Sequence, residues 1–123
     1  ATGGTSEIIA RSIANSLSTS LGQPVYVDNK PGGAGIIAME EVKRAKPDGY
    51  TLMLGHVGTL AVNPALFGKK LPYDPNTDFA PVTLVAKVPN VIAVSEKNPN
   101  KTLADFVADA KKNPGKIKPG CNI

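Results

Sequence analysis

Apolar residues recur at helical spacing near the start of the chain. The apolar positions, each four residues after the last, are Ile9, Ile13, Leu17 and Leu21. This period predicts an amphipathic helix over residues 5–21. Thr5 or Ser6 is placed to cap its beginning, and Gly22 is placed to end it in a left-handed conformation. An apolar stripe of this length must be buried, so we expect the helix to pack on a sheet.

Helical and strand-like patterns then alternate along the chain. Further helices are expected over 36–46, within 60–67, and after Thr102, whose hydroxyl is placed to cap the last of them. Residues 68–81 hold three prolines and are expected to form a long surface loop. Runs of β-branched and aromatic residues predict strands at 25–27, 50–54, 82–94 and 116–123.

This alternation predicts an α/β fold with a mostly parallel sheet flanked by helices. The pattern begins on a helix, where a βαβ unit would begin on a strand. We therefore expect an incomplete chain whose sheet lacks its first strand. A gap in the sheet would leave backbone donors unpaired, which predicts instability or edge-to-edge self-association.

Composition narrows the possible partners. The net charge is +4, but the lysines are scattered and Trp is absent, which disfavours a nucleic-acid partner. The single cysteine, Cys121, excludes an internal disulfide and a multi-cysteine metal site. No apolar run reaches the roughly 18 residues of a membrane span, and no signal peptide is recognisable in this chain.

Residues for catalysis are sparse. His56 is the only histidine, and neither a nucleophile elbow nor a paired set of carboxylates accompanies it. A loop histidine that hydrogen-bonds the backbone or a ligand is the simpler interpretation. The glycines at 32–35 lack the lysine and the spacing of a phosphate loop. We therefore expect no catalytic residues, no metal and no cofactor.

Two loops remain as candidates for binding. The backbone N–H groups of Gly3, Gly4, Thr5 and Ser6 precede a helix, where the dipole favours an anion such as a carboxylate. Residues 55–63 also join a predicted strand to a helix. Both loops would lie at the carboxyl edge of a parallel sheet, where open α/β folds bind ligands. Plain helix capping remains an equally good explanation of the first loop.

Linked short signatures point to a family. In order they read GQPV, NKPGGAG, PDGYTL, NPALF, LPYDP and DFAPV. With the opening GGTSEIIA, this series resembles the extracytoplasmic solute receptors of tripartite tricarboxylate transporters, the Bug receptors. The likeness spans almost the whole chain. It departs after Ile117, where the family usually continues with an aromatic residue and a Gly-Ser-Ala-Gly turn.

The resemblance implies a fold and a site. The fold would be part of a type II periplasmic-binding-protein fold, with residues 1–94 forming lobe one without its first strand and 95–123 beginning lobe two. The ligand-binding residues would lie on the two loops, as Gly3, Gly4, Thr5 and Ser6 on one and His56, Gly58, Thr59 and Asn63 on the other.

The resemblance also implies a function and its partners. The protein would be a periplasmic receptor without enzymatic activity that captures a small carboxylate, such as citrate, another di- or tricarboxylate, an amino acid or an aromatic acid. Its protein partners would be the membrane permease subunits of the transporter. The alternatives are an α/β enzyme with a Gly-rich anion-binding loop and a remnant fragment that binds nothing.

Overall fold

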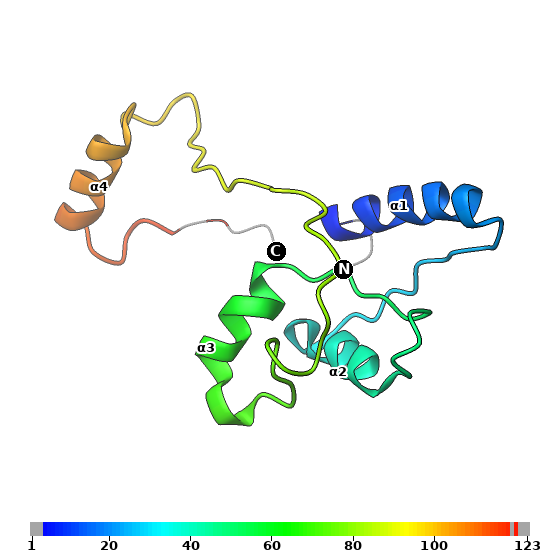
Figure 1. Ribbon diagram of the computed structural model, residues 1–123. Helices are drawn as coiled ribbons and strands as arrows, with labels where there is room; N and C mark the ends of the chain where they lie inside the picture. Colours follow the sequence, from blue (N-terminus) through cyan, green and yellow to red (C-terminus); the bar gives the residue numbers. More distant parts are fainter. Residues whose placement is uncertain (1–3, 119, 121–123) are drawn as a thin grey trace. The chain divides into compact units, whose positions relative to one another are not determined.

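The computed structural model describes residues 4–118 and 120. It divides into two compact units, residues 1–82 and residues 83–123. In Figure 1, helices are joined by extended segments. The elements of the first unit are α1 (Thr5–Leu21), η1 (Gly33–Gly35), α2 (Ile36–Arg44), η2 (Gly58–Val62), α3 (Asn63–Phe67) and η3 (Gly68–Lys70). The second unit contains α4 (Leu103–Lys112).

The helix α1 has the predicted length and the predicted end. Gly22 adopts a left-handed conformation with φ of 66°, and its N–H donates to the Ser18 carbonyl at 3.1 Å. The predicted cap is wrong, because the capping position is Gly4 and no side chain caps the helix. The backbone enters α1 in an extended conformation at Gly4, so Thr5 and Ser6 already belong to the first turn.

Side chains of α1 hold the segment that follows it. The Ser18 hydroxyl donates to the Ala14 carbonyl at 2.7 Å and accepts from the Val25 N–H at 2.9 Å. Further along, the Asn29 amide donates to the Glu7 carboxylate at 3.0 Å. Residues 25–29 therefore lie along α1 through side-chain hydrogen bonds rather than through a strand ladder.

The predicted parallel sheet is wrong for the part of the chain that the structure describes. Residues 25–27, 50–54 and 82–94 form neither helix nor strand, and no strand forms among residues 4–118 and 120, which include part of the predicted strand at 116–123. Many of their apolar side chains are exposed to solvent, with Tyr50 93% and Val91 84% exposed. A strand exists only when a neighbour accepts its hydrogen bonds, and none of these segments has one here. The partial type II periplasmic-binding-protein fold that the family resemblance implied is corrected as well, because that fold requires such a sheet.

The core of the first unit is small and half polar. Its buried residues are the apolar Ala14, Met39 and Tyr73 and the polar Glu7, Thr59 and Asn63. The apolar stripe of α1 is only partly covered, since Leu21 remains exposed. Burial on this scale supplies little hydrophobic free energy, so specific hydrogen bonds carry much of the local order. The predicted self-association through exposed backbone stays a prediction.

The second unit is built around α4. The Thr102 hydroxyl accepts from the Asp105 N–H at 3.1 Å, which confirms the predicted cap. Asp109, on the same helix, accepts from the amide groups of Asn100 and Asn113, both at 2.8 Å. One carboxylate thus joins the segments before and after the helix. None of the described helices is long and apolar enough to cross a membrane.

Replacing Gly22 with alanine should destabilise the end of α1 by about 1 kcal/mol, because a left-handed backbone is costly for a residue with a Cβ. An added Cβ would meet no atom within 4 Å, so the effect is conformational and not steric. Urea unfolding followed by circular dichroism at the helical band measures the change. Gly120→Ala is the matched control, since its Cβ would also meet open space. Equal stability of the two variants would contradict the assignment.

Candidate functional site

The first candidate segment is the beginning of α1. Gly4 is extended, with φ of −81° and ψ of 170°, and its carbonyl accepts from the Ile8 N–H at 3.2 Å. Thr5 and Ser6 form the first turn, where backbone N–H groups point out of the helix without a capping side chain. Gly3, the other predicted residue of this segment, lies outside the described residues.

A buried carboxylate lies beside this turn. The side chain of Glu7 is only 8% exposed, and Arg11 binds it at 2.7 Å from the same helix. Asn29 donates to the same oxygen at 3.0 Å. A carboxylate in the first turn is favoured by the helix dipole. Because the guanidinium compensates its charge, Glu7 repels an incoming anion less than an unpaired carboxylate would.

The second candidate segment, residues 56–63, is organised around its own backbone. The imidazole Nδ1 of His56 accepts from the Gly58 N–H at 3.0 Å, and the Thr59 hydroxyl donates to the His56 carbonyl at 3.1 Å. His56 is exposed, whereas Thr59 is buried. The simpler interpretation of His56, a loop histidine that bonds backbone, is the one that the geometry shows.

A break in helical hydrogen bonding follows in η2. The Asn63 N–H donates to the Gly58 carbonyl, five residues back, so this turn is π-helical. The same pattern would pair the Thr59 carbonyl with the N–H of residue 64, but that residue is Pro64 and has none. The Tyr73 hydroxyl donates to this carbonyl instead, at 2.6 Å. A side chain from a distant loop thus satisfies a buried acceptor that the helix leaves open.

The side chain of Asn63 also points into the protein. Its amide donates to the Ala34 carbonyl at 3.0 Å and to the Tyr73 hydroxyl at 3.2 Å. Against the same turn, a Cβ on Gly35 would lie 2.6 Å from the Thr59 side chain, so only glycine allows this approach. Asn63 and Thr59 therefore fasten residues 33–35 to η2, and their side-chain groups are occupied within the fold.

An ion pair joins the loop that carries Tyr73 to α2. The Lys43 ammonium, on α2, binds the Asp78 carboxylate at 2.9 Å and donates to the Pro72 carbonyl at 2.9 Å. The Asp74 N–H donates to Asp78 at 2.7 Å. That backbone hydrogen bond, together with Lys43, holds the pKa of Asp78 below its ordinary value. An open hollow of about 550 Å³ borders these groups.

The sequence pattern predicts the two candidate segments, which stay a prediction, but it does not predict the residues that support the second segment. Among the described residues, no hydrogen bond or ion pair links Gly4–Ser6 with residues 56–63, so each stands alone. Tyr73 was missed because residues 68–81 were expected to be a surface loop. The pattern that could have indicated it is a tyrosine between prolines in Leu71-Pro72-Tyr73-Asp74-Pro75. An aromatic ring adds no stability to a loop unless it is buried, so its presence there favours burial.

No group of three or more His, Cys, Asp or Glu side chains able to hold a metal occurs among the described residues. The buried side-chain polar atoms there all have hydrogen-bond partners. What the two segments can offer a ligand is therefore backbone N–H groups, hydroxyls and the His56 ring.

Comparison with known proteins identifies the family. The profile of the tripartite tricarboxylate transporter family receptor matches residues 9–122. The chain belongs to this receptor family, as its linked signatures predicted.

Curated relatives agree with the family assignment. A UPF0065 protein of Bordetella bronchiseptica is 44% identical over 109 residues, which is 89% of this chain and 32% of the relative. A UPF0065 protein of Agrobacterium vitis is 43% identical over 92% of this chain and 32% of its own length. Protein BugT of Bordetella pertussis is 36% identical over 94% of this chain and 35% of its own length. The chain thus spans about a third of the relatives it matches. No solved structure matches it significantly.

Asn63→Ala should destabilise the first unit by about 1–3 kcal/mol, because it removes the two hydrogen bonds that the buried Asn63 amide donates to the Ala34 carbonyl and the Tyr73 hydroxyl. Chemical unfolding followed by circular dichroism measures this cost. Asn15→Ala, on an exposed position of α1, is the matched control and should cost less than about 0.5 kcal/mol. If both variants unfold alike, the Asn63 amide does not hold the turn.

Asp78→Asn should remove an acid-sensitive part of the stability of this unit. Because the folded-state pKa of Asp78 is lowered, its contribution is present above the unfolded-state pKa and is lost as pH falls through the folded-state value. Thermal unfolding between about pH 6 and pH 2 should therefore show a smaller acid loss in the variant than in the parent chain. Asp48→Asn is the control on an exposed turn. Parallel pH profiles would contradict the role of the Lys43–Asp78 pair.

Proposed function

We propose that this chain is the solute-binding part of a transport receptor that captures a small carboxylate outside the cytoplasm. The observation that carries the proposal is the family match over residues 9–122, supported by relatives that include the protein BugT. A receptor of this class hands its solute to membrane permease subunits and does not transform it. The protein would therefore be non-enzymatic and extracytoplasmic.

The beginning of α1 supports an anionic solute. Its first-turn N–H groups are not capped by a side chain, and the helix dipole adds a favourable field for a carboxylate. Thr5 and Ser6 add hydroxyl donors to the same turn. A carboxylate takes several such donors at once, because each of its oxygens has two acceptor sites.

Residues 56–63 support the same solute class through a different set of groups. The inward Thr59 and Asn63 side chains fix the path of the loop, and the exposed ring of His56 borders it. We propose Gly4, Thr5, Ser6 and the second ring nitrogen of His56, Nε2, as the direct contacts of the solute, and the Gly58 N–H, which donates to His56 Nδ1, as the group that orients this ring. Citrate, other di- and tricarboxylates, amino acids and aromatic acids are the candidates.

Thr5→Pro tests the backbone contribution. Proline is tolerated at the first helical position, and the extended Gly4 before it suits a proline, so the helix should persist while one N–H donor is lost. Thr5→Ala is the matched control, because it removes only the hydroxyl. Isothermal titration of the complete protein with citrate, succinate, glutamate and benzoate should show at least tenfold weaker binding for Thr5→Pro than for Thr5→Ala. Equal affinities would exclude this N–H as a contact, and no binding by the parent protein would overturn the proposed function.

A further inference from the structure

The Tyr73 hydroxyl occupies a position that the helix geometry creates. In η2 the Asn63 N–H is taken by the Gly58 carbonyl, and Pro64 has no N–H to offer the Thr59 carbonyl. A buried carbonyl left without a donor keeps the full cost of its desolvation. The phenol oxygen lies 2.6 Å from this carbonyl and also accepts from the Asn63 amide at 3.2 Å. The Tyr73 hydroxyl therefore hydrogen-bonds both the Thr59 carbonyl and the Asn63 amide, the two polar groups that fix this loop.

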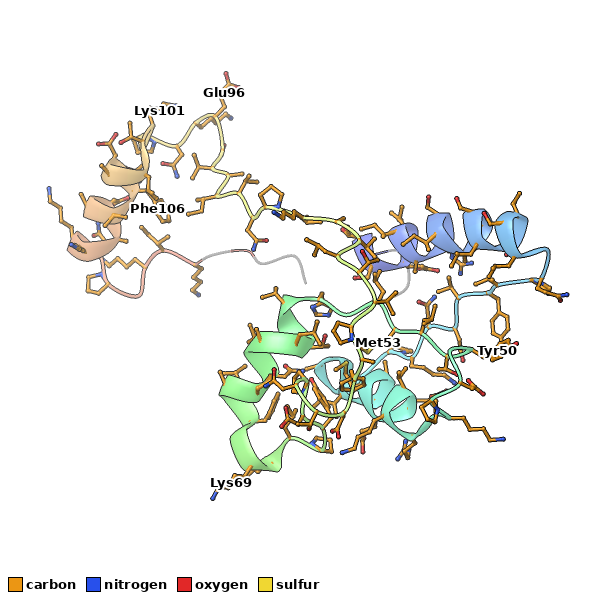
Figure 2. The ribbon with its side chains drawn as sticks, in the orientation of Figure 1. Tyr50, Met53, Lys69, Glu96, Lys101 and Phe106 are labelled. Carbon is orange, nitrogen blue, oxygen red and sulfur yellow. The ribbon has the colours of Figure 1, made fainter. Side chains whose placement is uncertain are left out.

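The ring of Tyr73 is placed independently of these hydrogen bonds. It meets Phe79 edge to face, with centroids 6.0 Å apart and planes at 77°. Lys43 fixes the loop on either side of it by binding the Pro72 carbonyl and the Asp78 carboxylate. A phenol whose ring is already fixed forms a more stable hydrogen bond to the backbone carbonyl than a mobile side chain would, because it loses less conformational entropy when the bond forms. Figure 2 shows Lys69 at the far end of this helical region, with its side chain extending away from it.

From this geometry we propose that Tyr73 is the positioning residue of the 56–63 loop, supplying the donor that Pro64 withholds from the Thr59 carbonyl. The π-helical turn then persists because a distant loop stabilises it, and not because the local sequence favours it. The inference rests on the proposed function only in that this loop is one of the two candidate solute contacts. Tyr73 itself touches no solute in this scheme, and it acts by fixing where His56 and Gly58 lie.

A double-mutant cycle separates this role from simple packing. Tyr73→Phe keeps the ring against Phe79 and removes only the hydroxyl. Amide hydrogen exchange of residues 58–63 in the complete protein should then become at least tenfold faster, while the amides of residues 11–18 in α1 keep their rates. Pro64→Ala restores an N–H that can reach the Thr59 carbonyl. The double variant should therefore exchange within about threefold of Pro64→Ala alone.

Tyr50→Phe provides the matched control, because Tyr50 loses the same hydroxyl from a ring that is 93% exposed. Its exchange rates should match those of the parent protein. Unchanged exchange in Tyr73→Phe, equal acceleration in α1, or an undiminished effect in the Pro64→Ala background would each overturn the positioning role.

Solute affinity is measured on the same variants by titration with the acids named above. If one binds the parent protein, Tyr73→Phe should weaken it severalfold, and Pro64→Ala should reduce that loss. Failure of all of these acids to bind the parent overturns the proposed function, whereas the exchange experiment still decides the role of Tyr73.

Discussion

The order of the first unit depends on a hydrogen bond of 2.6 Å between the Tyr73 hydroxyl and the Thr59 carbonyl. Pro64 has no N–H to donate to this carbonyl, so a side chain must supply the donor if the buried carbonyl is to be hydrogen-bonded. Because Asn63 joins the same cluster and reaches the Ala34 carbonyl, three distant segments meet at one polar point. Hydrogen bonds therefore hold these segments together, a role that a larger apolar core has in most domains.

A mostly polar junction has a consequence for how the unit responds to change. Apolar burial is non-directional and tolerates small shifts, whereas hydrogen bonds lose strength steeply with misalignment. Met39 is the one fully buried large side chain among the described residues. The Lys43–Asp78 pair and the Asn63 amide therefore matter more than their individual free energies would in a well-filled core, since few other contacts compensate for their loss.

Predictions of helices, which depend on neighbouring residues, were confirmed, whereas those that depend on residues far along the chain were not. The extents of α1 and α4 follow from spacing, Gly22 and Thr102, all within a few residues of the elements they define. The predicted strands at 25–27, 50–54 and 82–94 were wrong because β-branched and aromatic composition indicates only that a segment could pair with a neighbouring strand. It does not show that such a strand is present. Tyr73 was missed for the same reason. Its hydrogen-bond partner, the Thr59 carbonyl, is fourteen residues away, and this carbonyl lacks a backbone donor only because the turn is π-helical.

The two candidate segments differ in what they can contribute to selectivity. At the beginning of α1 the available groups are mainly backbone donors, which in the proposed function would bind the carboxylate of a solute without contacting the rest of it. In residues 56–63 the Thr59 hydroxyl and the Asn63 amide are engaged inside the fold. Selection among acids by this part of the chain would then come from the shape of a fixed backbone and from one imidazole. A loop that selects by shape must be held rigidly, which is the reason a positioning tyrosine belongs beside it.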